Sequence, residues 1–193
     1  PFLLVMVTSF TRIIVVLHFV RSALGTQTSP PNQVLIGIAL FLTLFIMAPV
    51  MTQINKDCIQ PYDKGKLTQE EALNAGLKPI RKFMFEQTNR KDIRLFMEIE
   101  KQSNDVSIEK EDEIPTLVLI PAFMISELRI AFIIGFLIYL PFIVIDMVVA
   151  STLMSMGMMM LPPTTISMPF KILLFVLADG WNLVIGQLVK TFY

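Results

Sequence analysis

The sequence has very little of the chemistry on which metal centres and disulfide frameworks depend. It contains one cysteine, Cys58, and one histidine, His18. A single cysteine excludes an intrachain disulfide and a cysteine-based metal cluster, and a single histidine excludes a multi-histidine site within one chain. The sequence therefore predicts no metal and no cofactor.

Common catalytic and nucleotide-binding motifs are also missing. There is no phosphate-binding glycine loop, no HExxH helix and no nucleophile elbow, so we expect no enzymatic activity. The formal net charge is zero, which argues against a nucleic-acid partner.

Apolar residues dominate the sequence. Of 193 residues, 54% are hydrophobic and 17% are charged, which is more apolar than an average soluble domain. Four apolar blocks occupy residues 2–20, 34–54, 114–161 and 170–189. Because a lone strand cannot satisfy its backbone groups in lipid, these blocks predict helices. We expect an all-α protein of membrane-associated, kinked helical hairpins that contacts membrane lipid.

The third apolar block is about twice as long as the ~20 residues that cross a hydrocarbon core. It predicts either two helical stretches joined near Pro141 or Asp146, or one long kinked helix. The chain starts at Pro1, inside an apolar run, so we expect it to be part of a longer precursor.

Residues 52–113 are polar and predict a small helical subdomain between a first hairpin, 1–51, and a second long hairpin, 114–193. Thr68 and Glu71 have the spacing of a capping box, opening a short helix that Gly76 ends. A single amphipathic helix is expected after it, with its apolar face formed by Ile80, Phe83, Met84, Ile93, Phe96 and Met97. Residues 103–113 are acidic and predict a flexible linker.

Orientation follows from the short turn between the first two blocks. This turn carries Arg21 and no acid, which favours the cytoplasmic side. The polar subdomain is then expected in the periplasm.

Six isolated charges interrupt the apolar blocks. The three bases and three acids are Arg12, Arg129, Lys171, Glu127, Asp146 and Asp179. An unpaired charge at the bilayer centre costs roughly 2.5–3.5 kcal/mol, so equal numbers of each sign predict ion pairs between helices or subunits. Glu127 and Arg129 are two residues apart and cannot share a helix face, and we predict a Glu127–Lys171 contact. The alternative is that the three acids form a proton or ion path.

A methionine-rich segment closes the third block. Its members are Met154, Met156, Met158, Met159 and Met160. Gly157 before the last three, and Pro162-Pro163 after them, predict a loop or a frayed helix end. Because methionine is unbranched and fills irregular gaps, a ring of such loops, one per subunit, would form a soft apolar seal.

Six stretches, in order along the chain, resemble the FliP family of flagellar export-gate proteins and its SctR-like counterpart in virulence type III secretion systems. They are TSFTRIIVVL (8–17), ALGTQTSPPNQVLIGIALFLTLFIMAPV (23–50), SELRIAFIIGF (126–136), IVIDMVVAS (143–151), GMMMLPP (157–163) and PFKILLFVLADGW (169–181). The resemblance covers essentially the whole chain.

The resemblance implies a pore-forming subunit without enzymatic activity. Family members assemble in several copies with FliQ and FliR into a helical cone, with which FlhB associates. The cone passes unfolded export substrates across the bacterial inner membrane at the flagellar basal body. Met158, Met159 and Met160 match the methionine gasket that narrows the pore. Family precursors carry a cleavable signal, and their hairpins pack largely out of the bilayer plane.

Two alternatives stay open at this point. One is an ion- or proton-coupled transporter subunit that uses Glu127, Asp146 or Asp179. The other is membership of a virulence secretion system, although the flagellar system is preferred.

Overall fold

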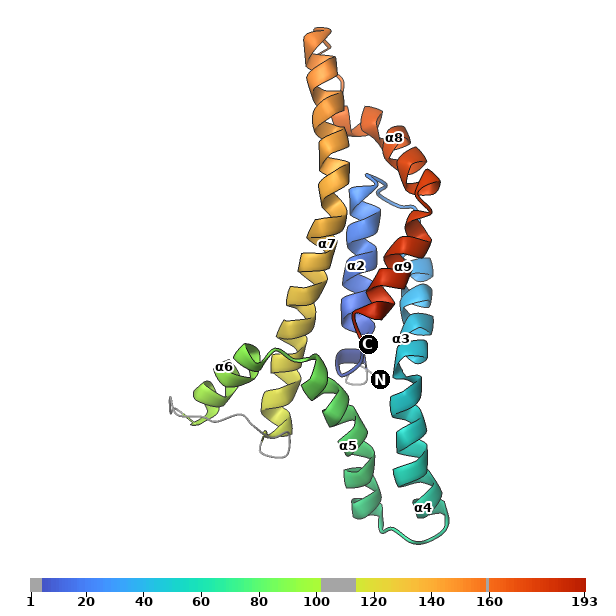
Figure 1. The fold of residues 1–193 in the computed structure, drawn as a ribbon, viewed down its shortest axis with the longest axis vertical. Helices are drawn as coiled ribbons and strands as arrows, with labels where there is room; N and C mark the ends of the chain where they lie inside the picture. Colours follow the sequence, from blue (N-terminus) through green and yellow to red (C-terminus); the bar gives the residue numbers. More distant parts are fainter. Residues whose placement is uncertain (1–4, 102–113, 159) are drawn as a thin grey trace. The chain divides into compact units, whose positions relative to one another are not determined.

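The computed structural model describes residues 5–101, 114–158 and 160–193, and these residues form helices and no strand (Figure 1). The predicted all-α fold is confirmed for this part of the chain. The chain divides into two compact units, which are described separately. Unit 1 comprises Pro1–Arg12 and Phe41–Ile130, and unit 2 comprises Ile13–Leu40 and Ala131–Tyr193.

Among the described residues, two helical segments are long and apolar enough to cross a membrane, and a third span is possible if the bent helix pair Pro163–Leu177 and Gly180–Lys190 acts as one. The first is α3, Asn32–Ile54, which continues through a π-helical turn, Asn55–Ile59, into α4, Gln60–Asp63. The second is α7, Thr116–Ser155. With 40 residues, α7 is about 60 Å long, roughly twice the thickness of a hydrocarbon core.

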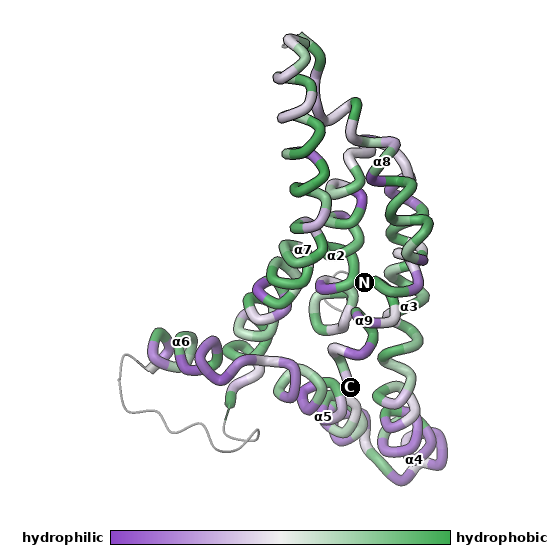
Figure 2. Tube along the Cα trace, turned by 45° about the horizontal axis from the view of Figure 1, so that its top comes forward, coloured by the Kyte–Doolittle hydropathy of each residue, from purple (hydrophilic) through white to green (hydrophobic). Residues whose placement is uncertain are grey.

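The third apolar block therefore forms a single helix rather than two stretches. Pro141 and Asp146 both lie inside α7. Proline removes one backbone hydrogen bond, but neighbouring helices and side chains commonly compensate for this in long apolar helices. Figure 2 shows α7 as mostly hydrophobic with a few isolated hydrophilic positions, in contrast with the more hydrophilic α4, α5 and α6.

After α4, the polar part of unit 1 continues with α5, Gln69–Gln87. The predicted capping box is present, because Thr68 Oγ1 accepts from the Glu71 amide while the Glu71 carboxylate accepts from the Thr68 amide. Gly76 was expected to end this helix, and that prediction is wrong. The helix continues through Gly76, which faces Cys58: the Cys58 Sγ would lie 3.3 Å from a β-carbon at this position. The glycine allows close approach between helices.

The prediction of a single amphipathic helix after Gly76 is also wrong, because its apolar face is shared between α5 and α6, Arg90–Lys101. The helix is interrupted at Asn89, whose side-chain oxygen accepts from the Lys91 backbone amide as the N-cap of α6. Phe83 of α5 nevertheless packs edge-on against Phe123 of α7, with ring centroids 6.1 Å apart. The acidic segment 103–113 lies outside the described residues.

Unit 2 contains most of α2, Phe10–Ala23, together with α8, Pro163–Leu177, and α9, Gly180–Lys190. The fourth apolar block is thus two helices, bent by 65° where they meet. Asp179 stands at the bend with a φ of 50°, a left-handed conformation that stops α8.

The core of unit 2 joins α2, α7, α8 and α9. Its buried members are Val20, Ala23, Leu24, Phe142 and Phe175. Trp181 packs edge-on against Phe175, with ring centroids 5.3 Å apart. On α7, Gly135 lies directly against the Phe19 ring of α2, so these two helices approach closely.

Candidate functional site

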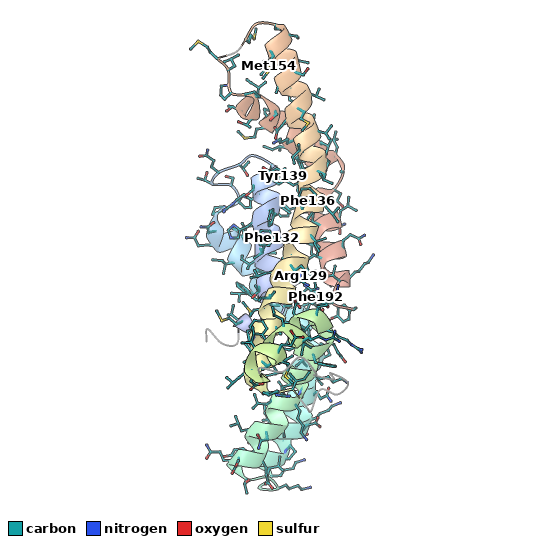
Figure 3. The ribbon with its side chains drawn as sticks, turned by 90° about the vertical axis from the view of Figure 1, so that its left-hand side faces the viewer. Arg129, Phe132, Phe136, Tyr139, Met154 and Phe192 are labelled. Carbon is teal, nitrogen blue, oxygen red and sulfur yellow. The ribbon has the colours of Figure 1, made fainter. Side chains whose placement is uncertain are left out.

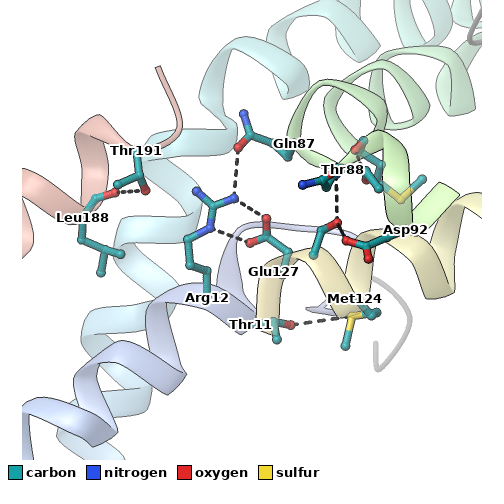
Figure 4. Close-up of polar contacts among 12 residues, drawn as sticks. Thr11, Arg12, Gln87, Thr88, Asp92, Met124, Glu127, Leu188 and Thr191 are labelled. Atoms are coloured by element: carbon teal, nitrogen blue, oxygen red, sulfur yellow. Dashed lines mark hydrogen bonds and ion pairs between the residues drawn. The ribbon is translucent and has the colours of Figure 1, made fainter. Parts of the chain in front are cut away.

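The charged side chain of Arg12 is placed in unit 1 by α2 and is almost completely buried (Figure 4). Its Nε donates to Glu127 Oε2 at 3.0 Å, and its Nη2 donates to Glu127 Oε1 and to Gln87 Oε1. Glu127 has no solvent-exposed surface, and Arg12 is 1% exposed. Burial of both charges requires this two-point pairing, because each would otherwise lose its hydration without replacement.

A second charge group in unit 1 centres on Asp92 of α6. One carboxylate oxygen accepts from Ser126 Oγ at 2.6 Å, and the other accepts from Arg129 Nη2 at 2.5 Å. Ser126 Oγ in turn accepts from the Asn89 amide at 2.9 Å (Figure 4). Asp92 is buried, whereas Arg129 remains 46% exposed, so only the acid depends fully on these partners.

The third group lies in unit 2 between α7 and α8. Lys171 Nζ donates to Asp146 Oδ2 at 2.6 Å, and Ser167 Oγ donates to Asp146 Oδ1 at 2.5 Å. Ser167 and Lys171 are four residues apart on α8, so both point to the same side of that helix. Both donors are buried, and each oxygen of Asp146 receives one hydrogen bond.

Among the described residues, two of the three predicted acids, Glu127 and Asp146, pair with predicted bases, but one predicted pair is wrong. Pairing between subunits stays a prediction. Glu127 binds Arg12 rather than Lys171, and Lys171 binds Asp146. Glu127 and Arg129 do have different partners, as their spacing predicts. The remaining acid, Asp179, accepts from Asn182 Nδ2 at 3.0 Å and forms no ion pair with any described residue.

Four hydrogen-bonding side chains of these groups were not identified from the sequence: Gln87, Asp92, Ser126 and Ser167. Asp92 carried a usable signal. It immediately precedes Ile93 and lies one helical turn before Phe96, so it sits beside the apolar face of α6. An acid at such a position is expected to need a partner, and Ser126 and Arg129 supply it.

All three acid–base groups include a residue of α7. Glu127, Arg129 and Asp146 each bind a side chain from a different helix, namely α2, α6 and α8. Such contacts orient helices by charge-assisted hydrogen bonds. These contacts also engage the carboxylates of Glu127 and Asp146, which a proton path would need to be available for proton transfer.

The methionine-rich segment follows the C-terminus of α7. Gly157 has a φ of 74°, its amide donates to Met154 O, and the Met158 amide donates to Leu153 O. This Schellman motif ends the helix, as the glycine predicts. Met154 is in the last turn of α7, and α8 begins at Pro163.

The described methionine side chains of this segment are exposed. The exposed fraction is 63% for Met154, 66% for Met156, 43% for Met158 and 99% for Met160. Met159 lies outside the described residues. Figure 3 shows Met154 near one end of α7, on the same helix as Arg129, Phe132, Phe136 and Tyr139. A large part of each of these side chains is therefore not covered by the described part of the chain.

Comparison with known proteins identifies the family. The FliP family model matches residues 1–188. The chain is 54% identical to flagellar biosynthetic protein FliP of Bacillus subtilis over 192 residues, covering 100% of this chain and 86% of that protein.

Two further relatives carry the same name. Identity is 49% over 193 residues with the protein of Pectobacterium carotovorum, covering all of this chain and 74% of the relative. It is 50% over 193 residues with that of Buchnera aphidicola subsp. Baizongia pistaciae, where this chain spans about half, 53%, of the relative's length. A whole-chain match at this identity is decisive, and the chain belongs to the FliP family.

Proposed function

We propose that this chain is a pore-forming subunit of the flagellar type III protein export gate, through which unfolded export substrates cross the bacterial inner membrane. Family membership over residues 1–188 carries this proposal. The relatives at 45–54% identity are named flagellar biosynthetic proteins, which favours the flagellar over the virulence system.

The apolar surface of the chain supports assembly with other subunits. In the most apolar window of α7, 11% of the residues are buried within the chain. Phe132, Phe136 and Leu140 are among its exposed side chains. So large an apolar surface needs lipid or protein to cover it. We propose several copies of the chain together with FliQ and FliR, associated with FlhB.

The composition of the assembly is directly measurable. The complex, purified in mild detergent through a tag on this chain, is expected to contain several copies of it with FliQ and FliR by native mass spectrometry. A monodisperse species of one copy without partners would contradict the proposal.

The exposed methionines support a sealing role for the loop after α7. Replacing Met158, Met159 and Met160 with alanine removes flexible apolar volume while keeping the residues uncharged. The complex is expected to assemble normally but to leak small ions when reconstituted in vesicles. As a matched control, alanine at Met51, an exposed methionine of α3, is expected to cause no leak. Equal leakage from the triple variant and the native complex would exclude the gasket role.

The second candidate function is proton- or ion-coupled transport by the acids of the apolar blocks, and one observation on Asp146 favours it. The Asp146 side chain is 24% exposed although it binds Lys171. If Asp146 transfers protons, Asp146→Asn abolishes export while the complex stays intact. If Asp146 holds α8 against α7, the variant loses assembly, which native mass spectrometry distinguishes.

A further inference from the structure

The short connection between α2 and α3 in unit 2 is held by one guanidinium group. Arg21, near the C-terminus of α2, donates from Nη1 to Asn32 Oδ1 at 2.5 Å and to Pro30 O at 3.4 Å. Asn32 is the first residue of α3. Arg21 thus joins the end of one helix to the start of the next across the intervening residues.

The same guanidinium group contacts His18, one turn earlier on α2. Arg21 Nη2 lies 3.0 Å from His18 Nδ1. Arginine has five N–H donors and no acceptor, so His18 Nδ1 must accept this hydrogen bond. Nδ1 then carries no proton, and the ring is neutral with its proton on Nε2. Protonation would place an N–H of the imidazolium against an N–H of the guanidinium.

We propose that the α2–α3 connection is a proton-sensitive clasp, closed while His18 is neutral and opened when His18 becomes an imidazolium. The proposal concerns regulation of the conformation of this chain and does not depend on the gasket or on any partner. When His18 is charged, repulsion displaces Arg21, and Asn32 and Pro30 lose their shared donor. The start of α3 is then released from the end of α2.

The charges around the clasp favour neutral His18. Arg21 is the charged group in contact with the ring, and the described residues place no carboxylate on it. Lys171 faces the connection from α8, since its Nζ would lie 3.9 Å from a β-carbon at Gly25, and its charge is paired with Asp146 of α7. Burial lowers the pKa of His18, and the positive charge of Arg21 lowers it further.

The pH window follows from these signs. Because the folded state disfavours protonated His18, the clasp contributes its full stability above the unfolded pKa of 6.5 and loses it as pH falls through the lower folded value. The single O–H of Thr26 also donates within the connection, with Ser29 O at 2.5 Å and Arg21 O at 3.3 Å as its acceptors. This donor does not titrate, and its hydrogen bonding should persist after the clasp opens.

Hydrogen–deuterium exchange of the purified complex tests the clasp. Protection of residues 24–32, corrected for the intrinsic pH dependence of exchange, is expected to fall at least about threefold between pH 7.5 and 5.5. His18→Gln is the matched variant, because its amide oxygen accepts from Arg21 and does not titrate. It should keep the native protection at pH 7.5 and show no fall at pH 5.5.

Two results of the exchange experiment would overturn the proposal. One is equal protection of the native connection at both pH values. The other is an equal fall in the native chain and in His18→Gln, which would assign the effect to another group. If His18→Gln does not assemble, the pKa of the His18 ring in the native chain is measured by NMR instead. A ring pKa at or above that of free histidine would also contradict the clasp.

Discussion

Arg12 and Glu127 lie 115 positions apart in the sequence, yet their side chains meet in unit 1 as a buried ion pair joined by two hydrogen bonds. Removing one partner leaves an uncompensated buried charge, whereas replacing both with apolar side chains leaves none. This difference separates a structural ion pair from a group that must stay ionised to function.

Glu127→Gln is expected to destabilise the folded chain by about 3–5 kcal/mol, because buried Arg12 keeps its charge but loses the carboxylate that pairs with it. The double replacement Arg12→Met with Glu127→Leu is expected to recover most of that loss. Thermal unfolding of the detergent-solubilised protein measures both changes. A double variant less stable than Glu127→Gln would show that the pair itself is required.

Ser126→Ala is expected to cost about 1–3 kcal/mol, because buried Asp92 loses a donor and the Asn89 amide loses its acceptor. Ser155→Ala is the matched control on the same helix. Ser155 is exposed and bonds only to Thr152 O among the described residues, so its removal is expected to stay within about 0.5 kcal/mol. Unfolding curves that coincide for the two variants would contradict the role given to Ser126.

Gly135→Ala is expected to destabilise unit 2 by about 1–3 kcal/mol, since the added β-carbon would overlap the Phe19 ring and lie 2.9 Å from the Phe19 β-carbon. In a Phe19→Ala background the same substitution should cost far less, and a double-mutant cycle measures this coupling.

Gly186→Ala on α9 is the control for that cycle. Nothing lies within 4 Å of a β-carbon at this position, and alanine favours a helix over glycine. The control is expected to be neutral or slightly stabilising in the isolated chain. A cost equal to that of Gly135→Ala would show that glycine loss alone explains both effects.

The start of α5 is expected to depend on pH. Hydrogen bonds from the Thr68 amide and hydroxyl lower the pKa of Glu71. Because the folded value lies below the unfolded one, this contribution is complete above pH 4.5 and is lost as pH falls through the folded pKa. Amide exchange at residues 69–72 should therefore accelerate in acid beyond the intrinsic rate.

Glu71→Gln tests the origin of that acid effect. Its side-chain oxygen still accepts from Thr68, but it does not titrate in this range. Exchange at the start of α5 should then follow the intrinsic rate throughout. Acid-dependent opening that persists in Glu71→Gln would assign the effect to Glu70 or another neighbour.

Several features were predictable because they depend on local chemistry. Long apolar blocks predict helices, since only a helix satisfies its own backbone in an apolar environment. The capping box at Thr68 and the helix stop at Gly157 follow from side-chain and backbone preferences within a few residues. Gly76 shows the limit of this reasoning, because a glycine that ends a helix and one that admits a neighbouring helix have the same local sequence.

The sequence alone determined that this chain is helical, that its isolated charges balance, and that its motifs resemble the FliP family. Only the tertiary structure decided which charges meet. Balance limits the number of ion pairs, but partner choice depends on how each helix is rotated and which helices pack together. Asp92 comes from the polar region and binds Arg129 because α6 places it beside α7, while Lys171 binds Asp146 because α8 folds back along α7.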